Sequence, residues 1–443
     1  MEQISPQLPS LSAALGLLVA LLTGLLVRNL LTKKPPYPPC IGGWIPWFGA
    51  AFKMGKAPLE FIHKAKQKHG PVFTVLAAGN RLTFVSGKEW IPVFFTSKEL
   101  DFQQAVQKPV LNTASIKKED FLKIHSSIHE KLKLCLSQSR LHMFFNRIHY
   151  EFSTRLDQLS SGEQRQVMYP AVVDTLFGKG LCPTGKDELK EFAEHFRRFD
   201  EGFEYGSQLP EFFLKDWSRS KQWLLTLFKR IVAEVENKNP PEENSKTVHQ
   251  HVLDTLKGNS TYNNSLLLLW ASQANANPVA KNPLNVTESD LKKLPFVKSC
   301  VLEAIRLRSP GAITRKVIQP IKIHNYLIPS GDLLMLSPYW IHRDPEMFPE
   351  PDVFKPERWK KANLEKNVFL DGFVAFGGGK FQCPGRWFAL MEIHMLVVLI
   401  LHKYEFSLLD PLPNQSNLHL VGTQQPDGPC RVRYKKREVM CSI

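Results

Sequence analysis

The chain has 443 residues, of which 43% are hydrophobic, and its 29 Phe residues are ample for a large core. The formal net charge is +15, but Lys and Arg are dispersed and no nucleic-acid-binding motif accompanies them, which argues against a nucleic-acid partner. We instead expect the positive charge to attract anionic lipid headgroups and an acidic protein partner. The seven scattered cysteines contain no CxxC pair, so they indicate a reducing compartment rather than a zinc site or a disulfide framework.

The N-terminal segment is predicted to be a membrane anchor. No charged residue occurs from position 3 to 27, and this mostly apolar stretch approaches the roughly 20 residues that a spanning helix needs. Arg28, Lys33 and Lys34 follow it, so the positive-inside rule places the C-terminal side in the cytosol. A cleavable signal peptide is the alternative, but it requires positive charge before the apolar stretch and small residues after it. We therefore expect residues 1–34 to form one transmembrane anchor.

A proline-rich connector and one large domain follow the anchor. Residues 35–39 (PPYPP) favour a stiff extended hinge, and residues 35–443 are expected to form a single domain. Helix-period apolar residues predict helices over 59–68, 121–141, 189–199, 217–235 and 386–404. Short strands are expected over 72–76, 83–85, 321–323 and 333–336, with a hairpin over 421–432. Residues 237–246 are polar and contain prolines, which indicates a surface loop.

Three motifs in the C-terminal half contain candidate functional residues. Glu303 and Arg306 are spaced i and i+3, which places them on one helix face, where a surface ion pair is the simplest interpretation. Residues 354–359 (FKPERW) form the second motif. The third is the glycine-rich stretch 376–385 (FGGGKFQCPG), which ends directly before the predicted helix 386–404.

Cys383 is the most informative residue of the third motif. Pro384 suits the first turn of a helix, so the thiolate would face unpaired backbone N–H groups and the positive end of the helix dipole. We expect this environment to lower the pKa of Cys383 and to make it a soft metal ligand. A lone intracellular cysteine is more often a small buried hydrophobic residue, and only the accompanying motifs favour the ligand.

Taken in order, ExxR, PERW and FxxGxxxCxG resemble the cytochrome P450 superfamily of haem-thiolate monooxygenases. The central segment 269–275 (LWASQAN) looks like the sterol 7α-hydroxylase branch. Residues 203–210 (FEYGSQLP), 313–317 (ITRKV) and 326–332 (YLIPSGD) resemble more closely the oxysterol 7α-hydroxylases that act on 24-hydroxycholesterol. The resemblance covers nearly the whole chain and implies a mainly α fold with small β-sheets and an N-terminal membrane anchor.

The resemblance implies haem b as the cofactor, with Cys383 as the axial ligand of its iron. Glu303, Arg306 and Arg358 would form a buried charge network behind the haem loop, and Arg315 would bind a haem propionate. Phe381 stands where the family often has an arginine, so Lys380 is expected to replace it or Arg315 to act alone. The implied cofactor-binding residues are Cys383, Arg315, Phe376, Gly379, Lys380, Gly385, Glu303, Arg306 and Arg358.

Further contacts of the haem and the substrate are also implied by the resemblance. His129 with Lys133, spaced i and i+4 on a helix, stands where the family often has Trp and Arg, and a solvated helix face is the equal alternative. Ile313 and Thr314 are expected to line the substrate pocket.

Ala271 and Asn275 are the implied catalytic residues, facing the haem from the central helix. Most family members have an acid followed by Thr here, whereas this chain has Ala274 and Asn275. Asn275 cannot deliver a proton by its own ionisation, so Ser272, Gln273 and water would complete a relay. The same residues also resemble the prostacyclin-synthase type of isomerase, which needs no relay and is the alternative function.

Asn275 and Glu303 are only 28 positions apart, and this is a departure from the family pattern. Pro278 and Pro283 oppose a continuing helix, and roughly two dozen residues are missing there relative to the resemblance. A splice form and a gene-model error both explain such a loss, and an inactive isoform is a further alternative.

The implied reaction is 7α-hydroxylation of an oxysterol in cholesterol catabolism and bile acid synthesis. Electrons from NADPH would arrive through a reductase flavoprotein. The implied location is the endoplasmic-reticulum membrane, with the catalytic domain in the cytosol.

Overall fold

The structure is a computed structural model. It describes residues 36–443 except 46, 158–167, 179–182, 184–185, 238–241, 243–244, 259, 274–287, 310, 365–368, 417–419, 421 and 438–443, and, before residue 36, only 16, 20 and 23. Apart from those three positions, the predicted anchor over 1–34 lies outside the described residues, and so does the predicted catalytic Asn275. The same is true of most of the shortened segment that precedes Glu303.

Helices make up most of the described chain. They are α2 (Ala51–Lys56), α3 (Pro58–His69), α4 (Trp90–Thr96), α5 (Phe102–Ala114), α6 (Lys118–Cys135), α7 (His142–Asp157), α8 (Met168–Leu176), α9 (Lys186–Glu201), α10 (Phe203–Gln208), α11 (Lys215–Glu236), α12 (Val248–Leu256), α13 (Thr261–Gln273), α14 (Glu288–Lys292), α15 (Pro295–Leu307), α16 (Pro338–Ile341) and α17 (Arg386–Lys403). Short 3₁₀ helices are η1 (Gln138–Arg140), η3 (Glu211–Phe213), η5 (Pro356–Lys361) and η6 (Gly379–Phe381).

The strands are short and form small sheets. They are β1 (Cys40–Ile41), β2 (Val72–Ala77), β3 (Asn80–Val85), β4 (Leu100–Asp101), β5 (Ile313–Val317), β6 (Ile321–Ile323), β7 (Tyr326–Ile328), β8 (Leu333–Leu336), β9 (Tyr404–Leu408) and β10 (Val432–Lys436). The main sheet has the order β1-β2-β3-β8-β5-β4, and two-stranded sheets join β6 to β7 and β9 to β10.

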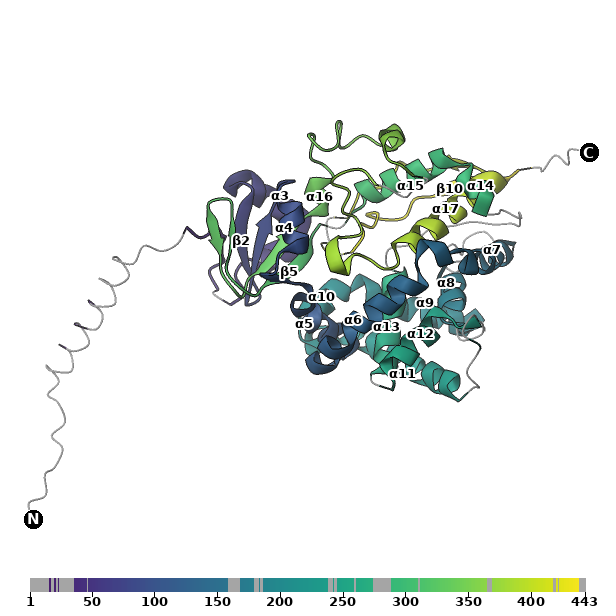
Figure 1. The fold of residues 1–443 in the computed structure, drawn as a ribbon, viewed down its shortest axis with the longest axis horizontal. Coiled ribbons are helices and arrows are strands. Elements are labelled where there is room, and N and C mark those ends of the chain that lie inside the picture. Colours follow the sequence, from purple (N-terminus) through teal and green to yellow (C-terminus); the bar gives the residue numbers. More distant parts are fainter. Residues whose placement is uncertain are drawn as a thin grey trace, which may run out of the picture.

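The main sheet and the helices occupy different parts of the molecule. Figure 1 shows the sheet with α3 and α4 at one end, where N-terminal strands lie beside strands from the middle of the chain. Helices α5 to α13 lie together on one side of the other end, and α15 and α17 lie across from them (Figure 1). The largest hydrophobic cluster joins α7, α8, α9, α11, α13 and α17.

The predicted mainly α fold with small sheets is confirmed, but one predicted element is wrong. The five predicted helices correspond to α3, α6, α9, α11 and α17, with bounds that differ by a few residues. Among the described residues of 421–432 the predicted hairpin is absent: Pro426 forms an isolated antiparallel bridge with Gln415, and Val432 begins β10, which pairs antiparallel with β9 so that Lys436 lies opposite Tyr404. The turn residues of 421–432 suggested a local pairing, whereas the partner strand follows α17 directly.

Part of the proline-rich hinge is bonded to the domain. The carbonyl of Pro36 accepts a hydrogen bond from the N–H of Leu327 at 3.0 Å, and that of Pro39 accepts one from Thr74 at 2.8 Å. Since proline cannot donate a backbone hydrogen bond, its carbonyl groups make these contacts with the sheet edges.

Among the described residues, one helical stretch, 379–402, is long and apolar enough to cross a membrane. Half of its apolar window is buried inside the protein, and it contains α17, which joins the largest hydrophobic cluster. We therefore interpret α17 as a core helix.

Candidate active site

The loop before Cys383 is held by backbone hydrogen bonds. The Cys383 N–H donates to the Phe376 carbonyl at 2.9 Å, and the Gly377 N–H donates to the Val374 carbonyl at 2.9 Å. Gly379 has a φ of +67°, and a Cβ atom there would lie 2.5 Å from the backbone oxygen of Phe95. Only glycine therefore fits at this position, which explains one of the glycines in the motif.

Cys383 lies three positions before Arg386, the first residue of α17, with Gly385 as the N-terminal cap. Its thiol accepts hydrogen bonds from the backbone N–H groups of Gly385 and Arg386, as the helix start predicts. The expected lowering of its pKa is nevertheless wrong in the chain alone. Burial among dense protein raises the pKa of the Cys383 thiol more than these N–H groups and Arg386 lower it, although the residue as a whole is exposed.

Glu303 is the fully buried centre of a charge network. Arg306 donates to both carboxylate oxygens at 2.9 Å, and Arg358 Nε donates to Oε1 at 2.9 Å. The Lys355 N–H and the Trp359 indole donate at 3.0 Å. Burial alone would raise the pKa of Glu303, but the bonds from Arg306, Lys355 and Arg358 outweigh it and keep the pKa below its usual value. The predicted network is confirmed, and the surface ion pair is excluded because Glu303 and Arg306 are 0% exposed.

His342 links this network to the loop of Cys383, and sequence reasoning missed it. Its Nδ1 lies 3.2 Å from the Arg306 carbonyl, and its Nε2 accepts from the Val374 N–H at 2.9 Å. The Val374 carbonyl in turn accepts from Gly377. Because Nε2 accepts a hydrogen bond, a neutral imidazole must carry its proton on Nδ1. The ring of His342 therefore connects α15 to the loop. Its place in IHRDP, between the two predicted motifs, was the available signal.

Two fully buried histidines predict that the protein loses stability in mild acid. Burial lowers the pKa of His342 to about 3 and that of His249 to about 4. Because the folded pKa values lie below the unfolded value, the unfolded chain binds more protons below about pH 6.5, and stability falls as the pH decreases. We expect each of these two histidines to lower the free energy of unfolding by roughly 1 kcal/mol between pH 7 and 5.5.

Urea unfolding at both pH values checks this expectation. The variant His249→Phe should lose roughly 1 kcal/mol of the pH dependence, because one buried neutral histidine is gone. Exposed His63 is the matched control, and His63→Gln should leave the dependence unchanged. Equal stability at both pH values would contradict the prediction.

Arg315 is a buried cation without an ion pair among the described residues. It is 7% exposed, and its Nη1 donates a hydrogen bond to the Thr314 carbonyl at 3.0 Å. Its guanidinium carbon lies over the rings of Phe94, Phe95 and Phe102 at 4.9–5.5 Å. Burial lowers the pKa of Arg315 to about 10, with Asp101 opposing the shift. Such a cation suits an anionic ligand, as predicted for a propionate.

His129 and Lys133 differ in their exposure to solvent. His129 is buried, and its Nε2 lies 3.0 Å from the Gln382 carbonyl, next to Cys383. Lys133 is exposed, so the solvated-face interpretation holds for it alone. Lys380 is also exposed, and its ammonium lies 5.3 Å from the ring centre of Phe381. Contact of Lys380 with a propionate stays a prediction.

Ala271 lies near the end of α13, a helix within the core. Leu269 and Gln273 on either side of it are buried, whereas Ala271 is exposed. Ala271 therefore faces an accessible space, as expected for a residue beside a bound group. Gly377 similarly has no atom within 4 Å of the position where a Cβ would stand.

These residues fit a haem. The donor set consists of an accessible thiol at a helix start, a glycine loop open on one side and a buried guanidinium that forms no ion pair within the described part of the chain. Thiolate is a known axial ligand of haem iron, and arginine pairs with carboxylates such as propionates. The fold and the site together define a haem-thiolate protein.

Comparison with known proteins agrees with this class. The cytochrome P450 family model matches residues 273–430. The chain is 48% identical to human 24-hydroxycholesterol 7-alpha-hydroxylase, over 99% of this chain and 100% of that protein. The mouse protein of that name is 48% identical over 90% of this chain and 93% of its own length. The chain therefore belongs to the cytochrome P450 family, and the family and enzyme class predicted from the sequence are confirmed.

More distant relatives support the family and the fold. Mouse cytochrome P450 7B1 is 27% identical over 97% of both chains. A solved structure of a cyanobacterial P450 with bound retinoic acid has a TM-score of 0.73 and 19% identity, and covers 91% of this chain and 100% of that chain. At this identity the likeness shows the fold alone.

The alignment also bears on the predicted missing stretch. It spans 477 positions with the human relative, whereas this chain has 443 residues, so at least 34 aligned positions have no counterpart here. The chain is therefore internally shorter than this relative. The location of the loss between Asn275 and Glu303 stays a prediction.

Proposed function

We propose that this chain is a haem-thiolate monooxygenase that hydroxylates an oxysterol at the 7α position, with 24-hydroxycholesterol as the substrate. The observation that supports this most is 48% identity to the human 24-hydroxycholesterol 7-alpha-hydroxylase along its entire length. The site agrees with it, since the thiol, the glycine loop and the Glu303 network are all present.

The chain's own residues have separate roles in this proposal. When bound, the haem supplies oxygen activation, and a thiolate ligand favours O–O cleavage. Cys383 binds the iron, Arg315 binds a propionate, and the Glu303–Arg306–Arg358 network positions the loop through His342. Phe376, Gly379, Lys380 and Gly385 are the remaining loop contacts. Ala271 and Asn275 face the reacting side, and Ile313 and Thr314 line the sterol pocket.

We further propose that NADPH supplies the electrons through a flavoprotein reductase. The net charge of +15 suits an acidic partner, and Lys380 is exposed close to Cys383. An isomerase would need neither NADPH nor a reductase, so this requirement separates the two functions.

We also propose that residues 1–34 anchor the protein in the endoplasmic-reticulum membrane, with the domain from 35 to 443 in the cytosol. Exposed aromatic residues in two regions support it. Trp44, Trp47 and Phe52 follow the hinge and are 94%, 57% and 63% exposed. Aromatic rings of this kind are favoured at the boundary between lipid and water.

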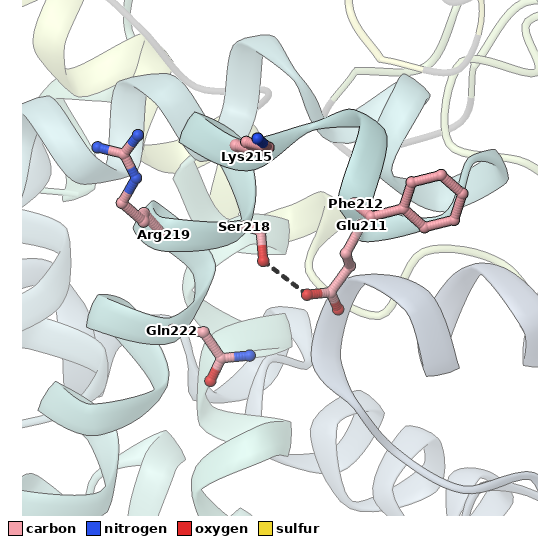
Figure 2. Close-up of a pocket in the computed structure, with 6 residues that line it drawn as sticks. All are labelled: Glu211, Phe212, Lys215, Ser218, Arg219 and Gln222. Atoms are coloured by element: carbon pink, nitrogen blue, oxygen red, sulfur yellow. Dashed lines mark hydrogen bonds between the residues drawn. The ribbon is translucent and has the colours of Figure 1, made fainter.

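The second region is a surface hollow beside η3 and α11. Figure 2 shows Phe212 projecting from this hollow, with Lys215 and Arg219 on the neighbouring helix. Phe212 is 68% exposed and Phe213 is 64% exposed. An apolar ring beside cations suits a surface with anionic headgroups.

Reconstitution with reductase tests the proposed function. The full chain with reductase and NADPH should convert 24-hydroxycholesterol to its 7α-hydroxy product, detected by mass spectrometry. Its reduced carbon-monoxide spectrum should show the band of thiolate ligation. Cys383→Ser should lose the band and at least about 100-fold in rate, because an alcohol is a far weaker anionic ligand.

The matched control is Cys135→Ser, which changes a buried cysteine at the end of α6. It should keep the thiolate band. Turnover without NADPH would favour the isomerase. A wild-type chain with no thiolate band would instead identify an inactive isoform.

A further inference from the structure

Two aromatic rings outside the haem motifs contact both Arg315 and the loop of Cys383. They belong to Phe95, near the end of α4, and to Phe102, the first residue of α5. The chain between these helices includes the short strand β4, which pairs with β5, the strand of Arg315. Both rings therefore come from one stretch of chain that passes beside the buried cation.

Phe102 connects the cation to the last residue of η6. The guanidinium carbon of Arg315 lies 4.9 Å from the centre of the Phe102 ring. The same ring lies against that of Phe381, with centroids 5.1 Å apart and planes tilted by 31°. Phe381 is two positions before Cys383 in the chain. One side chain thus bridges the candidate propionate ligand and the thiolate loop.

Phe95 makes a second bridge of the same kind. Its ring centre lies 5.5 Å from the guanidinium carbon of Arg315. A Cβ at Gly378 would lie 2.9 Å from Phe95 Cδ2, and a Cβ at Gly379 would lie 2.5 Å from the Phe95 carbonyl oxygen. The two glycines therefore let the loop lie directly on Phe95, where a larger side chain would push it away.

The main sheet fixes the position of α4. Phe94 is 1% exposed and belongs to one hydrophobic cluster with Val317 of β5 and Leu336 of β8. At the start of α4 the Trp90 indole donates to His324 Nε2 at 2.8 Å. A side chain packed in a dense core has little freedom to move. The residue that follows Phe94 therefore has a fixed backbone from which to contact the loop.

The ring contacts continue from Phe381 to the backbone next to the thiol. The His129 ring lies edge-on to that of Phe381, with centroids 5.5 Å apart, and its Nε2 lies 3.0 Å from the Gln382 carbonyl. Position 381 is where the family often has an arginine, so this chain holds the position through ring contacts instead of a charge. A continuous path of side chains thus runs from Arg315 through Phe102 to the loop.

Arg315 depends on these rings, because it forms no ion pair within the described part of the chain. Its hydrogen bond to Thr314 is to the carbonyl of the preceding residue. A guanidinium over an aromatic face is attracted by the ring electrons. Contacts that hold a binding group in place before its ligand arrives increase affinity, because less side-chain freedom is lost on binding.

We propose that Phe95 and Phe102 are positioning residues that hold the Arg315 guanidinium at a fixed place relative to the Cys383 loop. Neither ring is catalytic, since each acts through Arg315 and through the loop that it contacts. The proposal rests on the proposed haem site, in which Arg315 binds a propionate and Cys383 binds the iron. It is independent of the identity of the sterol.

Titration of the haem-free full chain with haem, followed at the Soret band, tests the proposal. Phe102→Leu should lower haem affinity about fivefold, because the guanidinium is no longer held in place before haem binds. In the Arg315→Leu background the same substitution should change the affinity by less than about twofold, the usual error of additivity. A ring that only filled space would lower the affinity by the same factor in both backgrounds.

Three further variants make the result specific. Phe102→Tyr retains the ring face and should bind haem with wild-type affinity. Phe95→Leu should repeat the pattern of Phe102→Leu, including its dependence on Arg315. Phe296→Leu is the matched control, because it removes a ring that is 57% exposed at the start of α15. It should leave the affinity unchanged in either background.

Contrary results separate this proposal from the proposed function. Unchanged haem affinity in both ring variants, or an equal loss with and without Arg315, would overturn the positioning role. A wild-type chain that takes up no haem would overturn it together with the haem site. Failure of haem-loaded wild type to hydroxylate an oxysterol would defeat the proposed substrate alone, because the titration uses no sterol.

Discussion

Glu303→Gln is expected to abolish haem incorporation. The substitution keeps the shape of the side chain but removes the charge that compensates Arg306 and Arg358, and Glu303 and Arg306 are fully buried. Removing one partner of a buried ion pair costs about 3–5 kcal/mol, a large share of the stability of a typical domain. The reduced carbon-monoxide spectrum should lack the thiolate band, and the chain should unfold at lower urea concentration.

Glu357→Gln is the matched control, because Glu357 is exposed and lies next to Arg358. It should retain the spectrum and the unfolding midpoint. Trp359→Phe removes only the indole bond to Glu303 and should cost about 1.5–3 kcal/mol. A Glu303→Gln variant with normal haem content and normal unfolding would contradict the role of the network.

Arg315→Leu is expected to weaken haem binding without destabilising the haem-free chain. Arg315 has no ion pair among the described residues, and the lowering of its pKa to about 10 reflects a desolvation cost on the order of 3 kcal/mol. Removing the cation relieves this cost in the haem-free protein but eliminates the partner of a propionate. Loss of a bond to a charged group corresponds to roughly a 10- to 150-fold lower haem affinity.

Titration of the haem-free chain with haem, followed at the Soret band, measures this affinity, and urea unfolding measures stability. The haem affinity of Arg315→Lys should lie between those of wild type and Arg315→Leu, because lysine retains the charge but lacks the paired donors. Lys316→Leu removes a neighbouring cation, which bonds to the Gly331 carbonyl, and should leave haem affinity unchanged. Equal haem affinity in Arg315→Leu and wild type would place the propionates elsewhere.

The missing stretch affects how these experiments are interpreted. At least 34 aligned positions of the human relative have no counterpart in this chain. The Glu303 network and the Cys383 loop are nevertheless complete, because both are built from residues after position 300 and from the helices that they contact. Haem binding and sterol turnover are therefore separable, and the carbon-monoxide spectrum should be recorded before turnover is measured.

Local features of the site followed from the sequence because neighbouring residues determine them. The i, i+3 spacing of Glu303 and Arg306 requires only one helix. Glycine and proline around Cys383 place the thiol at a helix start within a few residues. The expected strands over 321–323 and 333–336 match β6 and β8 as observed.

Contacts between distant segments could not be predicted from the sequence in the same way. Nothing near His342 predicts that its ring joins Arg306 to Val374, because each partner lies more than thirty positions away. The pairing of β10 with β9, and of Glu204 with Leu420, likewise depends on how the helices between them pack.

The sequence by itself determined the family, the candidate thiol ligand and the residue types of the charge network, because motif spacing is a property of the chain. Only the tertiary structure decided burial, and burial sets the electrostatics. It makes Glu303 an ion that accepts hydrogen bonds from four residues, leaves Arg315 without an ion pair among the described residues and raises the pKa of Cys383 despite its helix start. Desolvation depends on every atom packed around a group, and these atoms come from all parts of the chain.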